Sequence, residues 1–396
     1  MPTIPIKTDL LIIGGGINGV GIARDASGRG LSVMLVEQDE LASHTSSASS
    51  KLIHGGLRYL EHGEFRLVRE ALRERSILLR LAPDLIRPLT FVLPHAPHVR
   101  PAWMIRLGLF LYDRLGPRGG LPASRAVDLA PGHFGDGLKS RFRRGFTYAD
   151  AQVDDVGLVR ANAIGARQRG ADIRTHTRFI SAHRIEDGWR AMVRSMETGT
   201  EFEVDARVVV NAAGPWVGSV LDLMAGSKPE RPPRLVKGSH IVVRRMHAGD
   251  HAYILQNPDG RVVFAIPWQG EFTLIGTTDI EWTDDPSAPA ITPQETAYLC
   301  DAVNEWFERP IGPADVIRSF SGIRSLYDDG KSSASQVTRD YVLAEGPHML
   351  SVFGGKITTY RRLAEHALAK LERYFPDMTP EWTADAPLEE DPQCAT

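Results

Sequence analysis

The sequence has few of the residues that build metal centres, disulfide frameworks or membrane spans. Its 396 residues include only two cysteines, Cys300 and Cys394, and neither has the CxxC or Cys/His spacing of a zinc or iron–sulfur site. No apolar run approaches the roughly 20 residues that cross a bilayer, so any membrane contact must be peripheral. We therefore expect no bound metal and a reducing, cytoplasmic environment.

The sequence also has little net charge and no features of a signal peptide. The formal net charge is −3, which creates no field that would attract nucleic acid, and no nucleic-acid partner is expected. The first residues contain one lysine and a short apolar run that leads directly into glycines, unlike a signal peptide. The proportions of hydrophobic (42%) and charged (24%) residues are those of a globular protein, long enough for two substructures.

A glycine-rich turn is the strongest local motif. Gly14-x-Gly16-x-x-Gly19 lies between an apolar strand and a helix, and Glu37 ends the next strand. Gly14 permits the tight turn, Gly16 lets backbone amides approach a pyrophosphate, and Gly19 lets the helix pack closely. Glu37 is placed to bind a ribose diol. The motif predicts a site for NAD or FAD, and later glycine turns favour the longer FAD.

Hydrophobic periodicity predicts an α/β protein with a Rossmann-like FAD-binding domain and an inserted, mainly antiparallel substrate-capping domain. The expected elements are strands 9–13 and 31–37, helices 20–28 and 64–81, strands 206–212, 240–243, 252–255, 262–266, 273–276 and 349–353, and helix 358–374. The expected boundaries are 8–80, 146–220 and 346–382 for the FAD domain, 81–145 for a connecting region, 221–345 for the cap and 383–396 for a loose tail.

Several separated motifs together resemble one family. They are IIGGGINGVGIARDA, SSASSKLIHGGLRYLEHGEFRLV, KGSHIVV, IGTTD, FSGIRSL and FGGKITTYRRLAEHA, and they closely resemble the aerobic FAD-dependent glycerol-3-phosphate dehydrogenases. The resemblance implies an amino-acid-oxidase-like fold, oxidation of glycerol 3-phosphate to dihydroxyacetone phosphate, and ubiquinone as acceptor at the cytoplasmic face of the bacterial inner membrane. The family continues into a C-terminal helical domain, whereas this sequence stops at Thr396.

The motifs and the resemblance together name a candidate cofactor site. We expect FAD to contact Gly14, Gly15, Gly16, Asn18, Gly19, Glu37, Thr45, Ser46, Ser49, Ser50, Lys51, Gly214, Gly355, Lys356 and Thr358. The alternative interpretation of residues 45–50 is a flexible serine-rich loop.

Oxidation of a phosphorylated alcohol needs cations for the phosphate and a base for the hydroxyl proton. Arg58, Arg324 and Lys356 are the candidate cations, and Lys356 could instead stabilise the reduced flavin. His54 and His240 are the candidate bases, with His54 preferred because it lies near Arg58 in the sequence.

Other assignments remain open. Tyr59 and Thr278 are candidate substrate contacts, although Tyr59 could simply pack and the threonines of IGTTD could cap a turn.

The segment 100–114 predicts a short helix that is apolar around most of its circumference, with Arg106 and Asp113 in one polar stripe. It is either a membrane contact, helped by basic residues over 139–144, or a buried core helix. A homodimer is one assembly compatible with this interpretation. The alternative functions are a glycerol-3-phosphate oxidase, an inactive truncated flavoprotein and an NAD-dependent dehydrogenase, the last disfavoured by the turns after Gly214 and Gly354.

Overall fold

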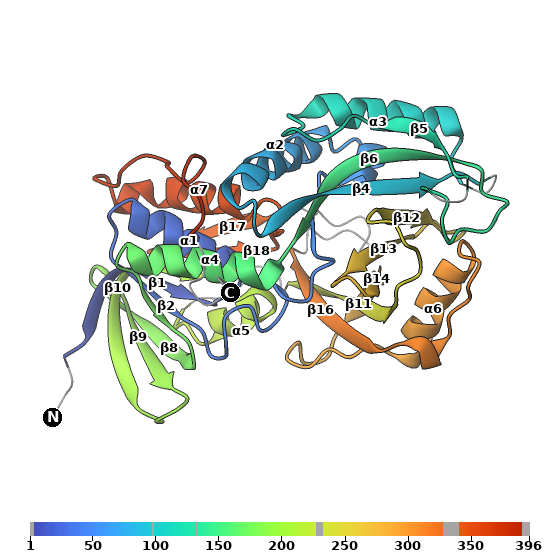
Figure 1. The fold of residues 1–396 in the computed structure, drawn as a ribbon. Helices are drawn as coiled ribbons and strands as arrows, with labels where there is room; N and C mark the ends of the chain where they lie inside the picture. Colours follow the sequence, from blue (N-terminus) through green and yellow to red (C-terminus); the bar gives the residue numbers. More distant parts are fainter. Residues whose placement is uncertain (1–3, 97–98, 131–132, 227–232, 328–339, 390–396) are drawn as a thin grey trace.

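The chain forms two sheets that lie side by side, each with its own helices. The computed structural model describes residues 4–96, 99–130, 133–226, 233–327 and 340–389. Figure 1 shows the first sheet with α1, α4 and α7 in one half of the molecule and the second sheet with α2, α3 and α6 in the other. Within the described ranges, no helix combines the length and the apolar character needed to cross a membrane.

The first sheet has a parallel centre, as the strand–turn–helix–strand pattern predicted. Its spatial order is β17 (Val342–Gly346), β18 (Met349–Phe353), β10 (Glu201–Asn211), β1 (Ile6–Ile13), β2 (Val33–Val36) and β7 (Asp172–Arg174). The strands β18, β10, β1, β2 and β7 run parallel, whereas β17 is antiparallel to β18. The hairpin of β8 (Thr177–Ile185) and β9 (Gly188–Ser195) continues from β10.

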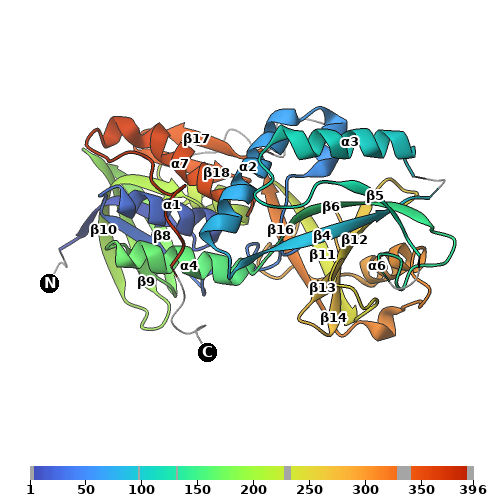
Figure 2. The ribbon, with the colours of Figure 1, turned by 45° about the horizontal axis from the view of Figure 1, so that its top comes forward.

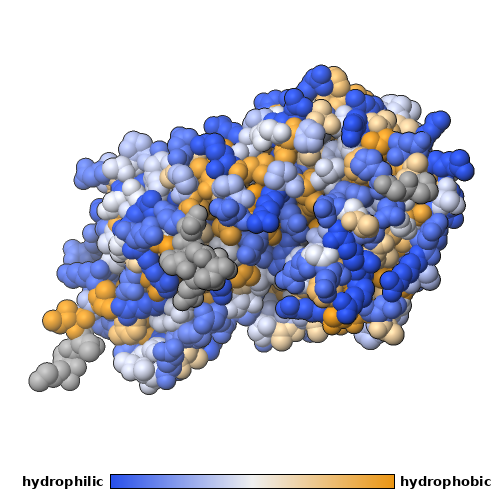
Figure 3. Space-filling model, in the orientation of Figure 1, coloured by the Kyte–Doolittle hydropathy of each residue, from blue (hydrophilic) through white to orange (hydrophobic). Residues whose placement is uncertain are grey.

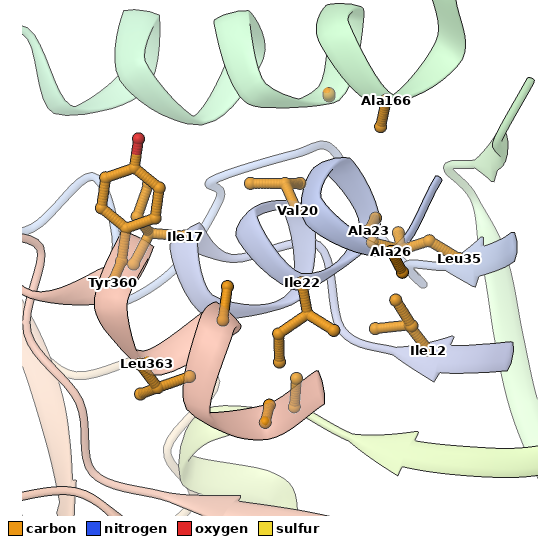
Figure 4. Close-up of a cluster of buried hydrophobic side chains, with 14 of the residues drawn as sticks. Ile12, Ile17, Val20, Ile22, Ala23, Ala26, Leu35, Ala166, Tyr360 and Leu363 are labelled. Atoms are coloured by element: carbon orange, nitrogen blue, oxygen red, sulfur yellow. The ribbon is translucent and has the colours of Figure 1, made fainter. Parts of the chain in front are cut away.

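Both faces of this sheet are covered, which explains the continuous apolar run of β1. Leu10 and Ile12 face a core formed with α1 (Ile17–Gly28), α4 (Asp155–Gln168) and α7 (Tyr360–Leu371), shown in Figure 4. Leu11 and Ile13 face the opposite core beneath the β8–β9 hairpin and α5 (Val217–Asp222). Alternate residues of a strand point to opposite faces, so a strand that is buried on both sides is apolar throughout.

The second sheet is mainly antiparallel and contains the predicted capping strands. Its path is β15 (Ile280–Trp282), β11 (Arg234–Arg244), β14 (Phe272–Gly276), β13 (Val262–Trp268), β12 (Ala252–Gln256), β4 (Ile86–Pro94), β6 (Arg144–Val153) and β3 (Leu52–Ile53). Two more strands pair at its sides, β16 (Arg318–Leu326) with β11 and β5 (Arg125–Asp128) with β6. The prediction that the strands from β11 to β14 form an antiparallel sheet is confirmed.

Helices cover the second sheet on both faces. One core packs against α6 (Pro293–Asn304), and the other packs against α2 (Phe65–Leu81) and α3 (Ala102–Leu115). The rotated view of Figure 2 shows α2 and α3 together over β4 and β6. The periodicity of the sequence predicts that Phe65, Val68, Leu72 and Leu79 share one face of α2. Val68 and Leu72 are buried and Leu79 is partly buried, whereas Phe65 at the start of the helix is exposed.

Two parts of the predicted organisation differ from the structure. The segment 81–145 was expected to be a connection, but β4 and β6 pair along nine residues and extend the second sheet. The tail from Thr383 was expected to be loose, yet Thr383 is buried against Arg361, and Glu389 forms ion pairs with Arg24 and Arg169. Residues 390–396, which include Cys394, lie outside the described residues.

Candidate functional site

A cavity of about 810 Å³ lies between the two sheets. Its walls come from the β1–α1 turn, the loop that precedes β3, the 3-10 turn η1 (Leu57–His62), and strands β11 and β16. Most of the predicted site residues line it: Gly14, Gly16, Asn18, Glu37, Thr45, Ser46, Ser49, Ser50, His54, Arg58, Tyr59, Gly214, His240, Arg324, Gly355, Lys356 and Thr358. Segments that are distant in the sequence therefore meet at one cavity.

The glycine turn has no room for side chains at two positions. Gly14 has φ +112°, and a Cβ there would lie 2.6 Å from the carbonyl oxygen of Ala212. A Cβ on Gly19 would lie 1.9 Å from the carbonyl oxygen of Gly14. Gly16 precedes the first turn of α1 and has no side chain of its own to cap it, so the backbone at the helix N-terminus lines the cavity, where it suits an anionic group.

Glu37 is held in place by backbone amides. Its two carboxylate oxygens accept hydrogen bonds from the amides of Gly15 at 2.7 Å and Asp39 at 2.9 Å. Each oxygen retains a lone pair, and the side chain lines the cavity. Gly15 does not line the cavity, and its amide serves to orient Glu37 instead.

Hydrogen bonds to other segments hold the serine-rich loop in place. The Thr45 hydroxyl donates to the Ile323 carbonyl at 2.7 Å, and the Ser46 hydroxyl accepts from the Ile17 amide at 3.0 Å. Lys51 does not reach the cavity, because its Nζ lies 2.7 Å from the Asp155 carboxylate. Lys51 thus anchors the loop to α4 rather than lining the predicted FAD site.

Three cationic side chains line the cavity, and they differ in whether a carboxylate pairs with them. Among the described residues, neither Arg58 nor Lys356 has a carboxylate partner, and the Lys356 ammonium lies 4.3 Å from the centre of the Tyr59 ring. Arg324 forms an ion pair with Asp279, which also lines the cavity. Arg58 and Lys356 therefore bring positive charge to the cavity wall in a protein whose net charge is slightly negative.

The two candidate histidines are neutral but differ in their hydrogen bonds. Burial lowers the pKa of His54, and burial followed by the charges of Arg324 and Lys51 lowers the pKa of His240 to about 3. His54 Nδ1 accepts the Gly56 amide at 3.0 Å, so its ring proton lies on Nε2. His240 Nε2 lies 2.9 Å from the Ser50 hydroxyl, and its buried Nδ1 has no partner within the described ranges.

The structure places Thr278 outside the cavity. Its hydroxyl donates to Glu295 at 2.8 Å and its oxygen accepts the Ser239 amide at 3.0 Å, in a buried network. Burial alone would raise the pKa of Glu295, but hydrogen bonds from Lys237 and its other partners lower it to about 2. Thr277, the preceding residue, lines the cavity instead.

Several cavity residues were missed by the sequence analysis. Tyr148 and Asp150 line the cavity from β6, and Ile254 and Phe264 line it from β12 and β13. Alternation along these strands could have identified their inward side chains, but not which end of the sheet meets the glycine turn.

The cavity residues fit FAD. Asn18 donates from Nδ2 to the Gly354 carbonyl at 3.1 Å, which joins the two glycine turns, and its buried Oδ1 has no partner among the described residues. A Cβ on Gly355 would lie 2.6 Å from the Asn18 Nδ2 atom, so this second turn must also be bare backbone. Two glycine turns, a carboxylate for a ribose and a cavity of about 810 Å³ together match a dinucleotide.

Comparison with known proteins gives the same result. Residues 9–361 match the model of the family described as FAD dependent oxidoreductase. The glycerol-3-phosphate dehydrogenase of Pseudomonas aeruginosa is 54% identical over 98% of this chain and 76% of its own, and the D-erythritol 1-phosphate dehydrogenase of Brucella abortus is 52% identical over 97% and 77%.

A solved structure agrees with these relatives. The glycerol-3-phosphate dehydrogenase from Bacillus halodurans complexed with FAD has a TM-score of 0.75 and 29% identity, over 96% of this chain and 68% of that one. The chain therefore belongs to the FAD-dependent oxidoreductase family and, within it, to the group that contains the aerobic glycerol-3-phosphate dehydrogenases.

Proposed function

We propose that the chain oxidises the C2 alcohol of sn-glycerol 3-phosphate to dihydroxyacetone phosphate. The observation that carries this proposal is the placement of the cations Arg58 and Lys356, which have no carboxylate partner among the described residues, in the same cavity as two neutral histidines. A phosphate dianion matches the cations, and its distance from the reacting carbon allows its binding to orient the C2 hydrogen. FAD, when bound, supplies the hydride acceptor.

The proton on the C2 hydroxyl needs an acceptor while the hydride leaves C2. His54 is fixed with its proton on Nε2, so it presents a donor to the cavity. The Ser50 hydroxyl lines the cavity and lies 2.9 Å from His240 Nε2, so it can accept the substrate proton while it passes its own proton to that nitrogen; His240 Nδ1 is buried and has no partner among the described residues. We therefore assign the proton transfer to His240 and orientation of the hydroxyl to His54, which reverses the preference drawn from the sequence.

The phosphate assignment is tested by Arg58→Ala with Arg194→Ala as its control. Arg194 forms a surface ion pair with Glu201 on the β9–β10 hairpin and does not line the cavity. Loss of Arg58 should lower kcat/KM for glycerol 3-phosphate by about 10- to 100-fold, because a charge-assisted hydrogen bond is worth about 1.5–3 kcal/mol. Bound flavin should be retained, and Arg194→Ala should match the wild type.

The same assay decides between related substrates and acceptors. D-Erythritol 1-phosphate, named for one relative, should be oxidised with a lower kcat/KM than glycerol 3-phosphate. An unchanged kcat/KM in Arg58→Ala would place phosphate recognition elsewhere. Rapid formation of hydrogen peroxide in air would favour the oxidase alternative over a quinone acceptor.

We further propose ubiquinone as the acceptor, with the protein bound peripherally to the cytoplasmic face of a bacterial inner membrane. The support is the outer face of α3, where Trp103 is 66% exposed and Leu107 50% exposed, next to the exposed Met104 and Phe110. In Figure 3, apolar side chains appear among charged ones along the upper edge, where α3 lies in Figure 1. Aromatic and aliphatic side chains on an exposed helix suit the bilayer interface.

The rest of α3 and the basic segment refine this proposal. The polar stripe of α3 is joined to the rest of the protein, because Arg106 and Asp113 both hydrogen-bond with Ser124. In the basic segment, Lys139 donates to the Asn304 carbonyl and Arg141 pairs with Glu305. The apolar face of α3 therefore carries the proposed contact better than the basic segment does.

A further inference from the structure

A buried polar network lies directly behind the turn that carries His54. It joins Arg75 of α2, Tyr112 of α3 and Asp150 of β6, and each of the three side chains is at most 3% exposed. The Tyr112 hydroxyl lies 2.8 Å from both carboxylate oxygens of Asp150, and Arg75 forms an ion pair with the same carboxylate. The ion pair balances the buried charge of Asp150, so the network is electrically neutral.

The turn is attached to this network through one backbone amide. The Gly55 amide donates to the Tyr112 oxygen at 2.8 Å, whereas the Asp150 Oδ1 atom is 3.5 Å away. A Cβ on Gly55 would lie 2.5 Å from the Tyr112 oxygen, so the turn rests directly on that hydroxyl. The next amide, that of Gly56, donates to His54 Nδ1.

We propose that Tyr112 is a positioning residue for His54. Its hydroxyl fixes the Gly55 amide, and the fixed turn keeps the Gly56 N–H on Nδ1 and the imidazole proton on Nε2, towards the substrate. This inference rests on the proposed function, since it assumes that His54 orients the reacting alcohol.

The protonation of Tyr112 is consistent with this role. Burial, followed by the charge of Asp150, raises the pKa of the Tyr112 phenol well above its ordinary value, so the hydroxyl remains a donor to Asp150 while it accepts from Gly55. Removal of the hydroxyl leaves the Gly55 amide only the 3.5 Å contact with Asp150. The ring itself packs in the core edge-on to Tyr148, with centroids 5.8 Å apart, and phenylalanine would keep that packing.

The first experiment compares Tyr112→Phe with Tyr253→Phe. Tyr253 is a matched control, because its buried hydroxyl also bonds twice, to the carbonyls of Phe134 and Asp136, but it belongs to the core beneath α6. We expect both variants to lower the melting temperature of the FAD-loaded enzyme. Only Tyr112→Phe should lower kcat, by about 10-fold or more, with KM for glycerol 3-phosphate within about 2-fold. An unchanged kcat in Tyr112→Phe, or an equal loss in Tyr253→Phe, would overturn the proposal.

The second experiment is a double-mutant cycle with His54→Gln, measured as the single-turnover rate of flavin bleaching by glycerol 3-phosphate. If Tyr112 acts through His54, adding Tyr112→Phe to His54→Gln should change this rate by less than about 2-fold. A second loss as large as that of Tyr112→Phe alone would refute the coupling. A wild-type enzyme that glycerol 3-phosphate does not bleach would instead refute the proposed function, so the two failures are distinguishable.

Discussion

At the scale of single residues, Gly19 shows how close packing specifies the cofactor turn. An alanine Cβ at this position would lie 1.9 Å from the Gly14 carbonyl oxygen, so α1 would have to move away from the turn. We expect Gly19→Ala to lower the free energy of unfolding by about 1–3 kcal/mol and to reduce the flavin content of the purified protein.

Gly108 provides the matched control for this change. It lies in α3, and no described residue comes within 4 Å of the place that an added Cβ would take, so Gly108→Ala should leave flavin binding unchanged and stabilise the helix by up to about 1 kcal/mol. Absorbance at the flavin band and urea unfolding measure the two effects. Full flavin retention in Gly19→Ala would show that this close contact is not needed for the site.

Most of the site residues predicted from the sequence line the cavity, but their hydrogen bonds were not predicted. Gly14, Gly16 and Glu37 line the cavity because the motif carries its own geometry. The preference between His54 and His240 could not be drawn from spacing, since it depends on the Gly56 amide and on Ser50. Similarly, nothing in IGTTD distinguishes Thr277, which lines the cavity, from the buried Thr278.

At the scale of elements, α3 is a surface helix with two different faces. Its inner face packs through Ile105, Leu109 and Tyr112, and its outer face exposes Leu107 and Phe110. Transfer of apolar side chains from water into the bilayer interface lowers the free energy. We therefore expect the double variant Leu107→Ser with Phe110→Ser to float much less with anionic liposomes, while its oxidation of glycerol 3-phosphate in solution is unchanged. Met196→Ser is the control, since Met196 is also 50% exposed but lies beyond β9. Equal flotation of both variants would move the membrane contact away from α3.

The pairing of strands β4 and β6 could not be predicted from the sequence. Both are long strands of the second sheet, and their pairing joins segments about 60 residues apart. Such pairing depends on long-range contacts that local periodicity does not contain. The capping strands from β11 to β14 were predictable because short turns connect several of them.

At the scale of the whole molecule, buried histidines make stability depend on pH, and two of them, His247 and His251, lie outside the cavity. Burial lowers the pKa of His247 to about 3 and that of His251 to about 4, whereas an unfolded histidine titrates near 6.5. Above this value both states are neutral and the histidines have no effect. Below it only the unfolded state binds protons, so the free energy of unfolding should fall by about 1.4 kcal/mol per pH unit for each histidine.

This loss should appear between about pH 6.5 and 4.5. The depressed pKa of Glu295 adds its own loss of stability only below its unfolded pKa, near 4.3. Urea unfolding at pH 7.5, 6.0 and 5.0 measures the slope. Replacement of His247 and His251 by glutamine should reduce it, and His54 and His240, whose pKa values burial also lowers, account for the remainder. The exposed His62→Gln is the control, and a slope that is unchanged by loss of both buried histidines would contradict this account.

The complete site exists only when both sheets and the later chain segments come together. The glycine turn belongs to the first sheet, Arg324 and His240 to the second, and Lys356 follows β18. Sequence motifs identified each part, but their convergence on one cavity required the tertiary structure. The packing of Thr383 to Glu389 against α1, α4 and α7 was not predicted, because an acidic, proline-containing segment has no local pattern that indicates such contacts.

The central claim is that one cavity binds FAD and oxidises glycerol 3-phosphate. It is tested most directly by anaerobic addition of glycerol 3-phosphate to the purified, flavin-containing protein while the flavin absorbance is recorded. We expect the flavin to be bleached and dihydroxyacetone phosphate to form in equal amount. Bound flavin that keeps its oxidised spectrum at saturating glycerol 3-phosphate would contradict it.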